Sequence, residues 1–215
     1  MIDVRMFTVG PVQENAFIVR RKDAASALII DPGDEAPKLL GALDSLGIET
    51  VEAILITHTH FDHVGAVAPV AEATKAPVYV PELEKGVLAN IMDYVPWPGF
   101  GPFESYDADH TVAGGETLEI AGFAIDVIFT PGHSPGHVTY AIAEEDAVFS
   151  GDVLFQGSVG RVDLPGGDWP TLLASIEKLT STYSPETTVY PGHMGITTLG
   201  RERATNPFLR ELAER

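Results

Sequence analysis

Imidazole and carboxylate side chains are crowded into one short segment of this sequence. The stretch 57–63 reads THTHFDH and contains His58, His60 and His63, with Asp62 among them. On an extended strand His58 and His60 would share one face, whereas a loop leaving the strand allows all four side chains to converge. Three imidazoles and one carboxylate make a ligand set of the kind that zinc or iron prefers. The alternative is a polar loop with unrelated histidines, and the clustering beside an acid favours the metal site.

Three later segments share another layout, in which an apolar run ends in a tight turn with a potential ligand. FTPGH ends in His133, SGD in Asp152 and YPGH in His193. Glycine beside each ligand lets the backbone approach closely and aim the side chain at a shared point. An ordinary turn aspartate is the alternative for Asp152, and the repeated layout favours a ligand. Because the chain has no cysteine, nitrogen and oxygen must hold any metal.

These segments follow elements that the sequence pattern predicts. Helices are expected at 35–46, ending at Gly47, and at 64–74, 171–183 and 201–215, where Leu212 is one apolar anchor. Strands interleaved with helices are typical of a layered α/β domain, whose active-site loops follow the carboxyl ends of strands. Short apolar runs bounded by Gly, Pro, Asp or Asn predict strands at 4–9, 16–19, 27–30, 51–56, 78–80, 117–120, 123–129, 138–142, 147–149 and 187–190.

One long segment, residues 93–109, has no periodic pattern. It holds three prolines, two glycines and five aromatic residues. A long loop inside a compact domain is usually functional or disordered, and this one is too aromatic for a solvated tail. It therefore either packs into the core or forms a lid over part of a substrate.

Composition narrows the class of protein. The 215 residues carry a formal net charge of −18, and 45% of them are hydrophobic. A single domain spanning 1–215 is expected. The negative charge disfavours binding to nucleic acid or to anionic lipid, and the chain shows neither a signal peptide pattern nor a membrane-length apolar run. We therefore expect a cytoplasmic protein acting on a small molecule.

The histidine and aspartate segments resemble those of the metallo-β-lactamase superfamily. HTHFDH at 58–63, His133, Asp152 in SGD and His193 in PGH follow the family's order over nearly the whole chain. The resemblance implies an αββα sandwich of two mixed sheets flanked by helices, with two divalent metals. It assigns His58, His60 and His133 to the first metal and Asp62, His63 and His193 to the second, with Asp152 bridging them. Zinc is expected, with iron or manganese as alternatives.

A finer resemblance is to short glyoxalase II-like hydrolases. It is carried by GDVLFQGSVGRVDLPGGD at 151–168 and TLGRERATNPFL at 198–209. Two departures concern the thiol of the substrate: the chain ends before the helical domain of the long enzymes, and Met194-Gly195-Ile196 follows His193 where they have Glu-Tyr. Glutathione, mycothiol, bacillithiol, coenzyme A or a simpler thiol remain open.

This resemblance implies a hydrolase that cleaves a hydroxyacyl thioester with a metal-bound hydroxide. Asp62 is expected to be catalytic, because it would both ligate the second metal and orient the nucleophile. The alternatives are an iron-dependent persulfide dioxygenase, with one iron on His58, His133 and Asp152, and a lactonase, β-lactamase or other ester hydrolase. The acyl group, the native metal and the oligomeric state are left open.

Three further polar residues have two interpretations each. His137 is expected to support the site rather than to ligate, because it opens the strand 138–142. His110 is expected at the surface or in a flap. Arg161 either pairs with Asp163 or anchors a substrate carboxylate.

Overall fold

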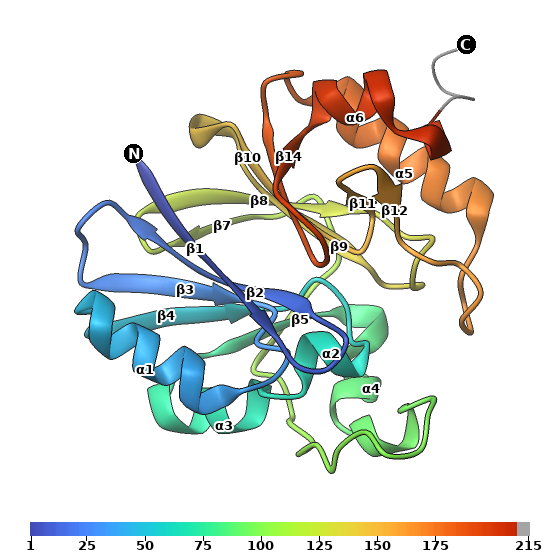
Figure 1. Cartoon of the computed structure of the whole chain (residues 1–215). Coiled ribbons are helices and arrows are strands. Elements are labelled where there is room, and N and C mark those ends of the chain that lie inside the picture. Colours follow the sequence, from blue (N-terminus) through green and yellow to red (C-terminus); the bar gives the residue numbers. More distant parts are fainter. Residues whose placement is uncertain (210–215) are drawn as a thin grey trace. The chain divides into compact units, whose positions relative to one another are not determined.

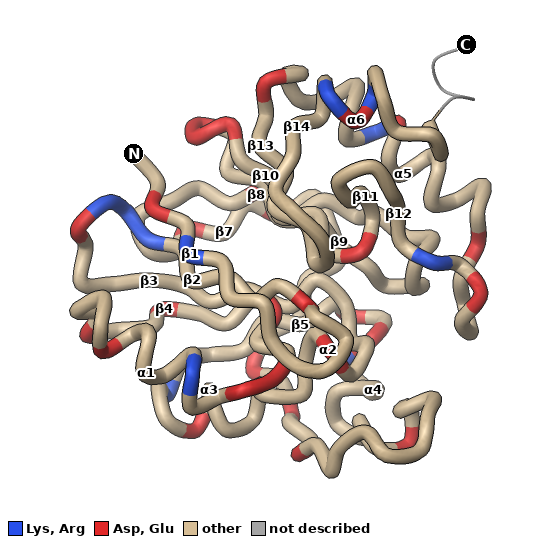
Figure 2. Tube along the Cα trace, in the orientation of Figure 1, with Lys and Arg blue, Asp and Glu red and all other residues tan. Residues whose placement is uncertain are grey.

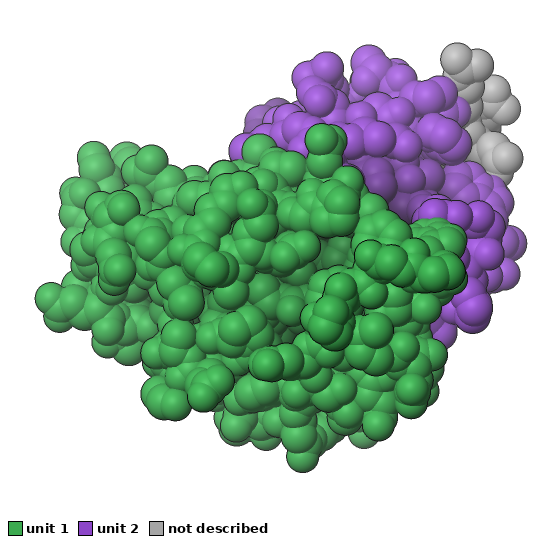
Figure 3. Space-filling model, turned by 60° about the horizontal axis from the view of Figure 1, so that its bottom comes forward, with its two compact units in different colours: residues 1–112, 119–123 green, residues 113–118, 124–215 purple. Residues whose placement is uncertain are grey.

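The computed structural model describes residues 1–209, which divide into two compact units (Figure 3). Unit 1 comprises residues 1–112 and 119–123, and unit 2 comprises residues 113–118 and those from 124 onward. The expectation of one domain over 1–215 stays a prediction. Acidic residues are spread along the trace of both units (Figure 2) and outnumber the basic ones, 31 against 13.

Unit 1 contains a six-stranded mixed sheet in which the order of strands in space equals their order in the chain. Strands β1 to β3 pair antiparallel, and β3 to β6 pair parallel. Helices α1 and α3 cover one face of this sheet (Figure 1), where Leu39 and Val70 pack with Ile54 in the core. The strands are β1 (Ile2–Val9), β2 (Glu14–Arg21), β3 (Ser26–Ile30), β4 (Thr50–Leu55), β5 (Val78–Pro81) and β6 (His110–Val112); the helices are α1 (Ala36–Leu46), α2 (Phe61–Val64), α3 (Val67–Thr74) and α4 (Lys85–Leu88).

Most of the second sheet, ordered β14-β13-β10-β9-β8-β7, lies in unit 2. It is also mixed, because β10 and β13 pair parallel while β8, β9 and β10 pair antiparallel. Helix α5 buries Leu172, Ile176 and Leu179 with Val148 and Val189. The elements are β7 (Thr117–Ile120), β8 (Phe123–Phe129), β9 (Val138–Ile142), β10 (Ala147–Gly151), β13 (Thr188–Pro191), β14 (Thr197–Thr198), the hairpin β11 (Leu154–Phe155) and β12 (Ser158–Val159), and helices α5 (Trp169–Thr182) and α6 (Leu199–Thr205).

The predicted elements are confirmed with several differences, one of which is that the pattern missed the short helix α4. All ten predicted strands form, but the pattern missed the short strands β6, β11, β12 and β14. The helix expected at 64–74 is two helices, α2 and α3, interrupted at Gly65 and Ala66. Of the predicted C-terminal helix, α6 and a 3-10 turn, Pro207–Leu209, are present; residues 210–215, including Leu212, lie outside the described residues. Within residues 1–209, none of the helices has the length and apolarity needed to cross a membrane.

The aromatic segment 93–109 is partly packed against the core and partly exposed. Phe100, Phe103 and Tyr106 are half-buried against the core of unit 1. Trp97 remains 39% exposed, with its ring centroid 6.1 Å from that of Phe61. Core packing therefore describes most of the aromatic residues, and Trp97 is the part of the segment that could still act as a cover.

Candidate metal centre

The parallel strands of unit 1 bring polar residues to one edge of the sheet. Asp31 directly follows β3, and the segment beginning at Thr57 follows the neighbouring strand β4. Glu84 ends the 3-10 turn Glu82–Glu84 (η1) that follows β5, the next strand. Because parallel strands end at the same edge, residues distant in sequence meet there.

Asp31 accepts three hydrogen bonds from the histidine segment and is nearly fully buried. The backbone N–H of Thr57 donates to Oδ1 at 2.7 Å, and the Thr57 hydroxyl donates to Oδ2 at 2.6 Å. His63 Nδ1 donates to the same Oδ2 at 2.9 Å. Asp31 adopts a positive φ of 47°, a conformation that aspartate tolerates better than most residues. The buried carboxylate thus fixes the start of the histidine segment and one of its rings.

A relay extends this anchor to His58. Since the Thr57 hydroxyl gives its hydrogen to Asp31, it accepts one from His58 Nδ1, 3.1 Å away. Both buried histidines, His58 and His63, are therefore held through Nδ1, which leaves Nε2 as the ligating nitrogen. Their ring centroids are 4.1 Å apart, and candidate ligand atoms of Asp31, His58 and His63 lie within 4.8 Å of one another. Within this group Asp31 is the hydrogen-bond partner of His63.

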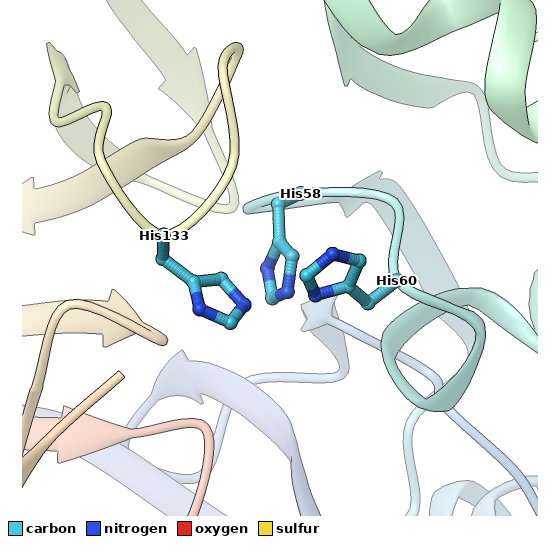
Figure 4. A group of neighbouring side chains, drawn as sticks. All are labelled: His58, His60 and His133. Carbon is cyan, nitrogen blue, oxygen red and sulfur yellow. The ribbon is translucent and has the colours of Figure 1, made fainter. Parts of the chain in front are cut away.

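The other two predicted ligands of unit 1 lie in the same segment. The His60 ring is edge-on to that of His58, with centroids 4.8 Å apart (Figure 4). Asp62 lies in α2 with Oδ2 3.9 Å from His63 Nε2. The structure therefore brings His58, His60, Asp62 and His63 together, as the sequence predicted.

Glu84 holds the middle of this segment. Its buried Oε2 accepts the backbone N–H of Thr59 at 2.7 Å and the Thr59 hydroxyl at 3.0 Å. Thr59 stands between His58 and His60, so Glu84 fixes the backbone that spaces these two rings. Strained or irregular segments need such anchors because a loop has few backbone partners of its own.

The three predicted ligands of unit 2 also follow strand ends. His133 follows β8 (Figure 4), Asp152 follows β10 and His193 follows β13. Asp152 Oδ2 is 3.4 Å from His133 Nε2 and 3.6 Å from His193 Nε2. One carboxylate oxygen thus faces two imidazole nitrogens, an arrangement suited to a shared cation.

The His133 ring is oriented by the backbone. Its Nδ1 donates to the carbonyl oxygen of Arg161 at 2.8 Å, again leaving Nε2 for a ligand. Gly160 permits this approach, because a Cβ there would lie 1.8 Å from the Asp152 carbonyl oxygen and 3.1 Å from His133 Nδ1. Gly132 has a φ of 125°, and a Cβ there would meet the α5 backbone.

His137 supports Asp152 rather than joining the ligands. Its Nε2 accepts the backbone N–H of Asp152 at 3.0 Å, and its Nδ1 donates to the Thr130 hydroxyl at 3.1 Å. Both ring nitrogens of this fully buried histidine are thereby used. These bonds are those that the predicted supporting role requires.

The segment after His193 is tied to the β11–β12 hairpin by a buried acid. Glu202 in α6 is fully buried and accepts hydrogen bonds from Gly157 N, Thr197 Oγ1 and Asn206 Nδ2 at 2.7, 2.6 and 2.9 Å. The hairpin places Phe155 edge-on to His193, with centroids 5.6 Å apart. The motif at 198–209 therefore holds the hairpin that places Phe155 beside His193.

Arg161 and His110 lie outside the predicted ligand set, and each is found in one of its two expected settings. Arg161 forms a two-pronged ion pair with Asp163, at 2.6 and 2.7 Å, and this hydrogen bonding lowers the pKa of Asp163 to about 2. His110 is exposed on β6, with its ring 4.6 Å from that of Tyr79.

The donor set fits divalent metal ions. It consists of imidazoles and carboxylates, and the rings of His58, His63 and His133 are held at Nδ1, so that Nε2 is the nitrogen left for a metal. Sequence reasoning missed Asp31 and Glu84. The run Ile30-Asp31-Pro32-Gly33 shows the same strand-and-turn layout as the ligand segments and could have revealed Asp31, whereas nothing around Glu84 distinguishes it from a surface acid.

Comparison with known proteins supports this interpretation. The pattern of the metallo-β-lactamase superfamily matches residues 9–193. "Probable metallo-hydrolase YqgX" of Bacillus subtilis is 42% identical over 95% of this chain and 96% of its own. "Hydroxyacylglutathione hydrolase GloC" of Haemophilus influenzae is 32% identical over 97% of this chain and 98% of its own.

Two solved structures show the same fold. The B3 metallo-β-lactamase BLEG-1 has a TM-score of 0.90 and 40% identity, covering 96% of this chain and 99% of its own. TTHA1623 in a di-iron-bound form has a TM-score of 0.76 and 43% identity, covering 95% and 100%. The predicted metallo-β-lactamase fold is thus confirmed, and the chain is a metal-dependent hydrolase by these relationships. It belongs to the metallo-β-lactamase superfamily.

Proposed function

We propose that this protein hydrolyses a thioester with the help of two divalent metal ions. In this reaction the carbonyl carbon gains an oxygen from water and loses the sulfur, so a carboxylic acid and a thiol are produced. The observation that carries the proposal is that predicted histidine ligands are held at Nδ1 by partners from their own unit, in a chain 32% identical to a protein named hydroxyacylglutathione hydrolase.

The proposed assignment uses all seven predicted ligands. His58, His60 and His133 would hold one metal, Asp62, His63 and His193 the other, and Asp152 would be shared. Support comes from the Nδ1 anchors of the rings and from Asp152 Oδ2 facing both His133 and His193. Such metals supply Lewis acidity that lowers the pKa of water to about 7.

The residues of the chain then hold and orient the reactants. Asp62 is proposed to align the attacking water, because its carboxylate is only partly buried and lies beside His63. The departing thiolate has an ordinary pKa of about 8.5, so it needs no strong general acid. The supporting residues Asp31, Glu84 and His137 keep the ligands in place, which limits the reorganisation needed during the reaction.

The test compares two reactions of the purified protein. Thiol release from lactoyl-glutathione is measured without oxygen, and oxygen uptake is measured with glutathione persulfide. We expect anaerobic thiol release that stops on metal removal, returns with zinc and is strongly reduced in Asp62→Ala. Rapid oxygen uptake with negligible thiol release would replace the hydrolase with the dioxygenase.

The metal assignment has its own measurement. Elemental analysis should give up to two metals per chain, and His58→Ala and Asp152→Ala should lose metal together with activity. Full activity in a metal-free preparation would overturn the proposal. Because a structural relative is a B3 metallo-β-lactamase, cleavage of a chromogenic cephalosporin serves as the comparison for amide hydrolysis.

A further inference from the structure

A pocket of about 280 Å³ opens beside Asp62, within unit 1. Four segments enclose it: the β1–β2 turn, the turn after β3, helix α2 with the adjoining Gly65, and the aromatic segment. Apart from two aspartates, the side chains that line it are apolar, among them three phenylalanines and two valines, although polar groups also reach its surface. Its lining includes Val12, Asp34, Phe61, Asp62, Phe100 and Phe103.

The three phenylalanines form one cluster. The Phe61 centroid lies 4.9 Å from that of Phe100 and 5.7 Å from that of Phe103. Phe61 is 5% exposed and directly precedes Asp62, so the aromatic wall begins at the predicted metal ligand. Clefts that mix an apolar wall with few polar groups are typical of sites for small organic groups.

The charge of the pocket has one sign. Asp34 and Asp62 are its charged lining residues, and among the described residues no lysine or arginine lines it. If Asp62 holds a metal ion, as proposed, Asp34 is the other carboxylate on this wall. Its Oδ1 accepts the backbone N–H of the neighbouring Glu35 at 2.6 Å. An anionic group entering here would meet a like charge beside apolar walls.

We propose that this pocket binds the acyl group of the thioester and selects an uncharged, apolar acyl chain over one that ends in a carboxylate. This inference rests on the proposed function and names the substrate class of that site. A volume of about 280 Å³ is close to the lower end, about 300 Å³, of the range for sites that bind small organic molecules. A short linear or aromatic acyl group fits this space, and a long fatty acyl chain does not.

The kinetic test uses two thioesters of the same thiol with acyl chains of similar length. Hexanoyl thioester is uncharged at its end, and glutaryl thioester ends in a carboxylate. We expect kcat/KM for hexanoyl to exceed that for glutaryl by about tenfold, because repulsion from a partly exposed carboxylate is screened. Asp34→Asn should remove most of this difference by improving glutaryl cleavage. Asp23→Asn, at the other end of β2, makes the same charge change and should leave the ratio unaltered.

A binding test is independent of hydrolysis. Trp97 lies 6.1 Å from both Phe61 and Phe100, and Trp169 is the other tryptophan of the chain. In a Trp169→Phe background, Trp97 fluorescence should respond to benzyl alcohol and hardly to benzoate. Val12→Phe should weaken the response to benzyl alcohol by filling the pocket.

The outcomes separate this inference from the proposed function. Selective benzyl alcohol binding without any thioester cleavage would refute the function and retain an apolar pocket with no acyl role. Thioester cleavage with equal rates for hexanoyl and glutaryl, unaffected by Asp34→Asn, would refute the acyl-pocket inference alone. Equal binding of benzoate and benzyl alcohol would refute the charge selection.

Discussion

The buried carboxylate of Asp31 sets the tautomers of two predicted metal ligands, and Asp31→Asn tests this directly. If the amide oxygen keeps the bond to Thr57 N, the amide nitrogen takes the place of Oδ2 and can only donate. His63 Nδ1 must then accept, which moves the ring proton to Nε2. The Thr57 hydroxyl must likewise turn toward His58 Nδ1, which moves that proton to Nε2 as well.

The expected effect is a large loss of metal affinity in a folded protein. A protonated Nε2 cannot ligate until its proton moves back, and loss of such a supporting partner typically weakens metal binding by about 10–100-fold. At about 1.4 kcal/mol per factor of ten, this amounts to about 1.4–2.8 kcal/mol. Stability without metal should fall by about 1–3 kcal/mol, because buried bonds to a charged acceptor become bonds to a neutral one.

Three measurements check this prediction. Nitrogen-15 spectra of the metal-free protein report the tautomers of His58 and His63, competition with a zinc chelator gives the affinity, and urea denaturation gives the free energy of unfolding. Thr57→Val should affect only His58, and Asp44→Asn, on the exposed face of α1, should affect neither histidine. Unchanged tautomers, or unchanged zinc affinity with altered tautomers, would refute the reasoning.

The other predictions concern stability and pH. Glu202→Gln should lower the free energy of unfolding by about 2–4 kcal/mol in denaturant titrations, because three donors lose a fully buried charged acceptor. A loss below about 0.5 kcal/mol, the typical size of the effect of a surface substitution, would contradict this. Trp97→Ala should leave thermal stability nearly intact while changing KM, since its side chain is 39% exposed; a core-like loss of about 3–5 kcal/mol would rule out a cover. Arg161→Gln should raise the pKa of Asp163 from about 2 toward 3.8 in a carbon-13 titration, so the pair's contribution is present above pH 3.8 and is lost as pH falls toward 2. A titration unmoved by the substitution would exclude Arg161 as the cause.

The elements that carry the site could be predicted because their signals are local. A β-branched run that ends at a Pro-Gly turn is visible in the sequence, and His133 and His193 both follow such a run. The short strands β11 and β14 could not be predicted in this way. Two residues give no periodicity, and each of these strands forms by pairing with a short partner strand: β14 with β13, as in Thr197 with Val189, and β11 with the equally short β12.

The candidate ligands could likewise be located in the sequence, but most of their hydrogen-bond partners could not. A ligand stands in a dense motif, whereas Glu84 reaches Thr59 from 25 residues away and Asp31 reaches His63 from 32 residues away. Such partners are selected by the parallel order of β3, β4 and β5, which becomes known only with the sheet. His137 is the exception, since its place at the start of β9 already indicated a supporting role.

The two units orient their histidines by different chemical means, and this bears on how each tolerates sequence change. In unit 1 the anchor is a side chain, Asp31, so a single substitution can reverse the tautomers it imposes. In unit 2 the anchor of His133 is a backbone carbonyl, which no substitution removes, and the sensitive position is instead Gly160, where a side chain would collide with the backbone of Asp152. The same requirement, an imidazole held at Nδ1 so that Nε2 is left to bind, is therefore met by a carboxylate in one unit and by close backbone packing in the other.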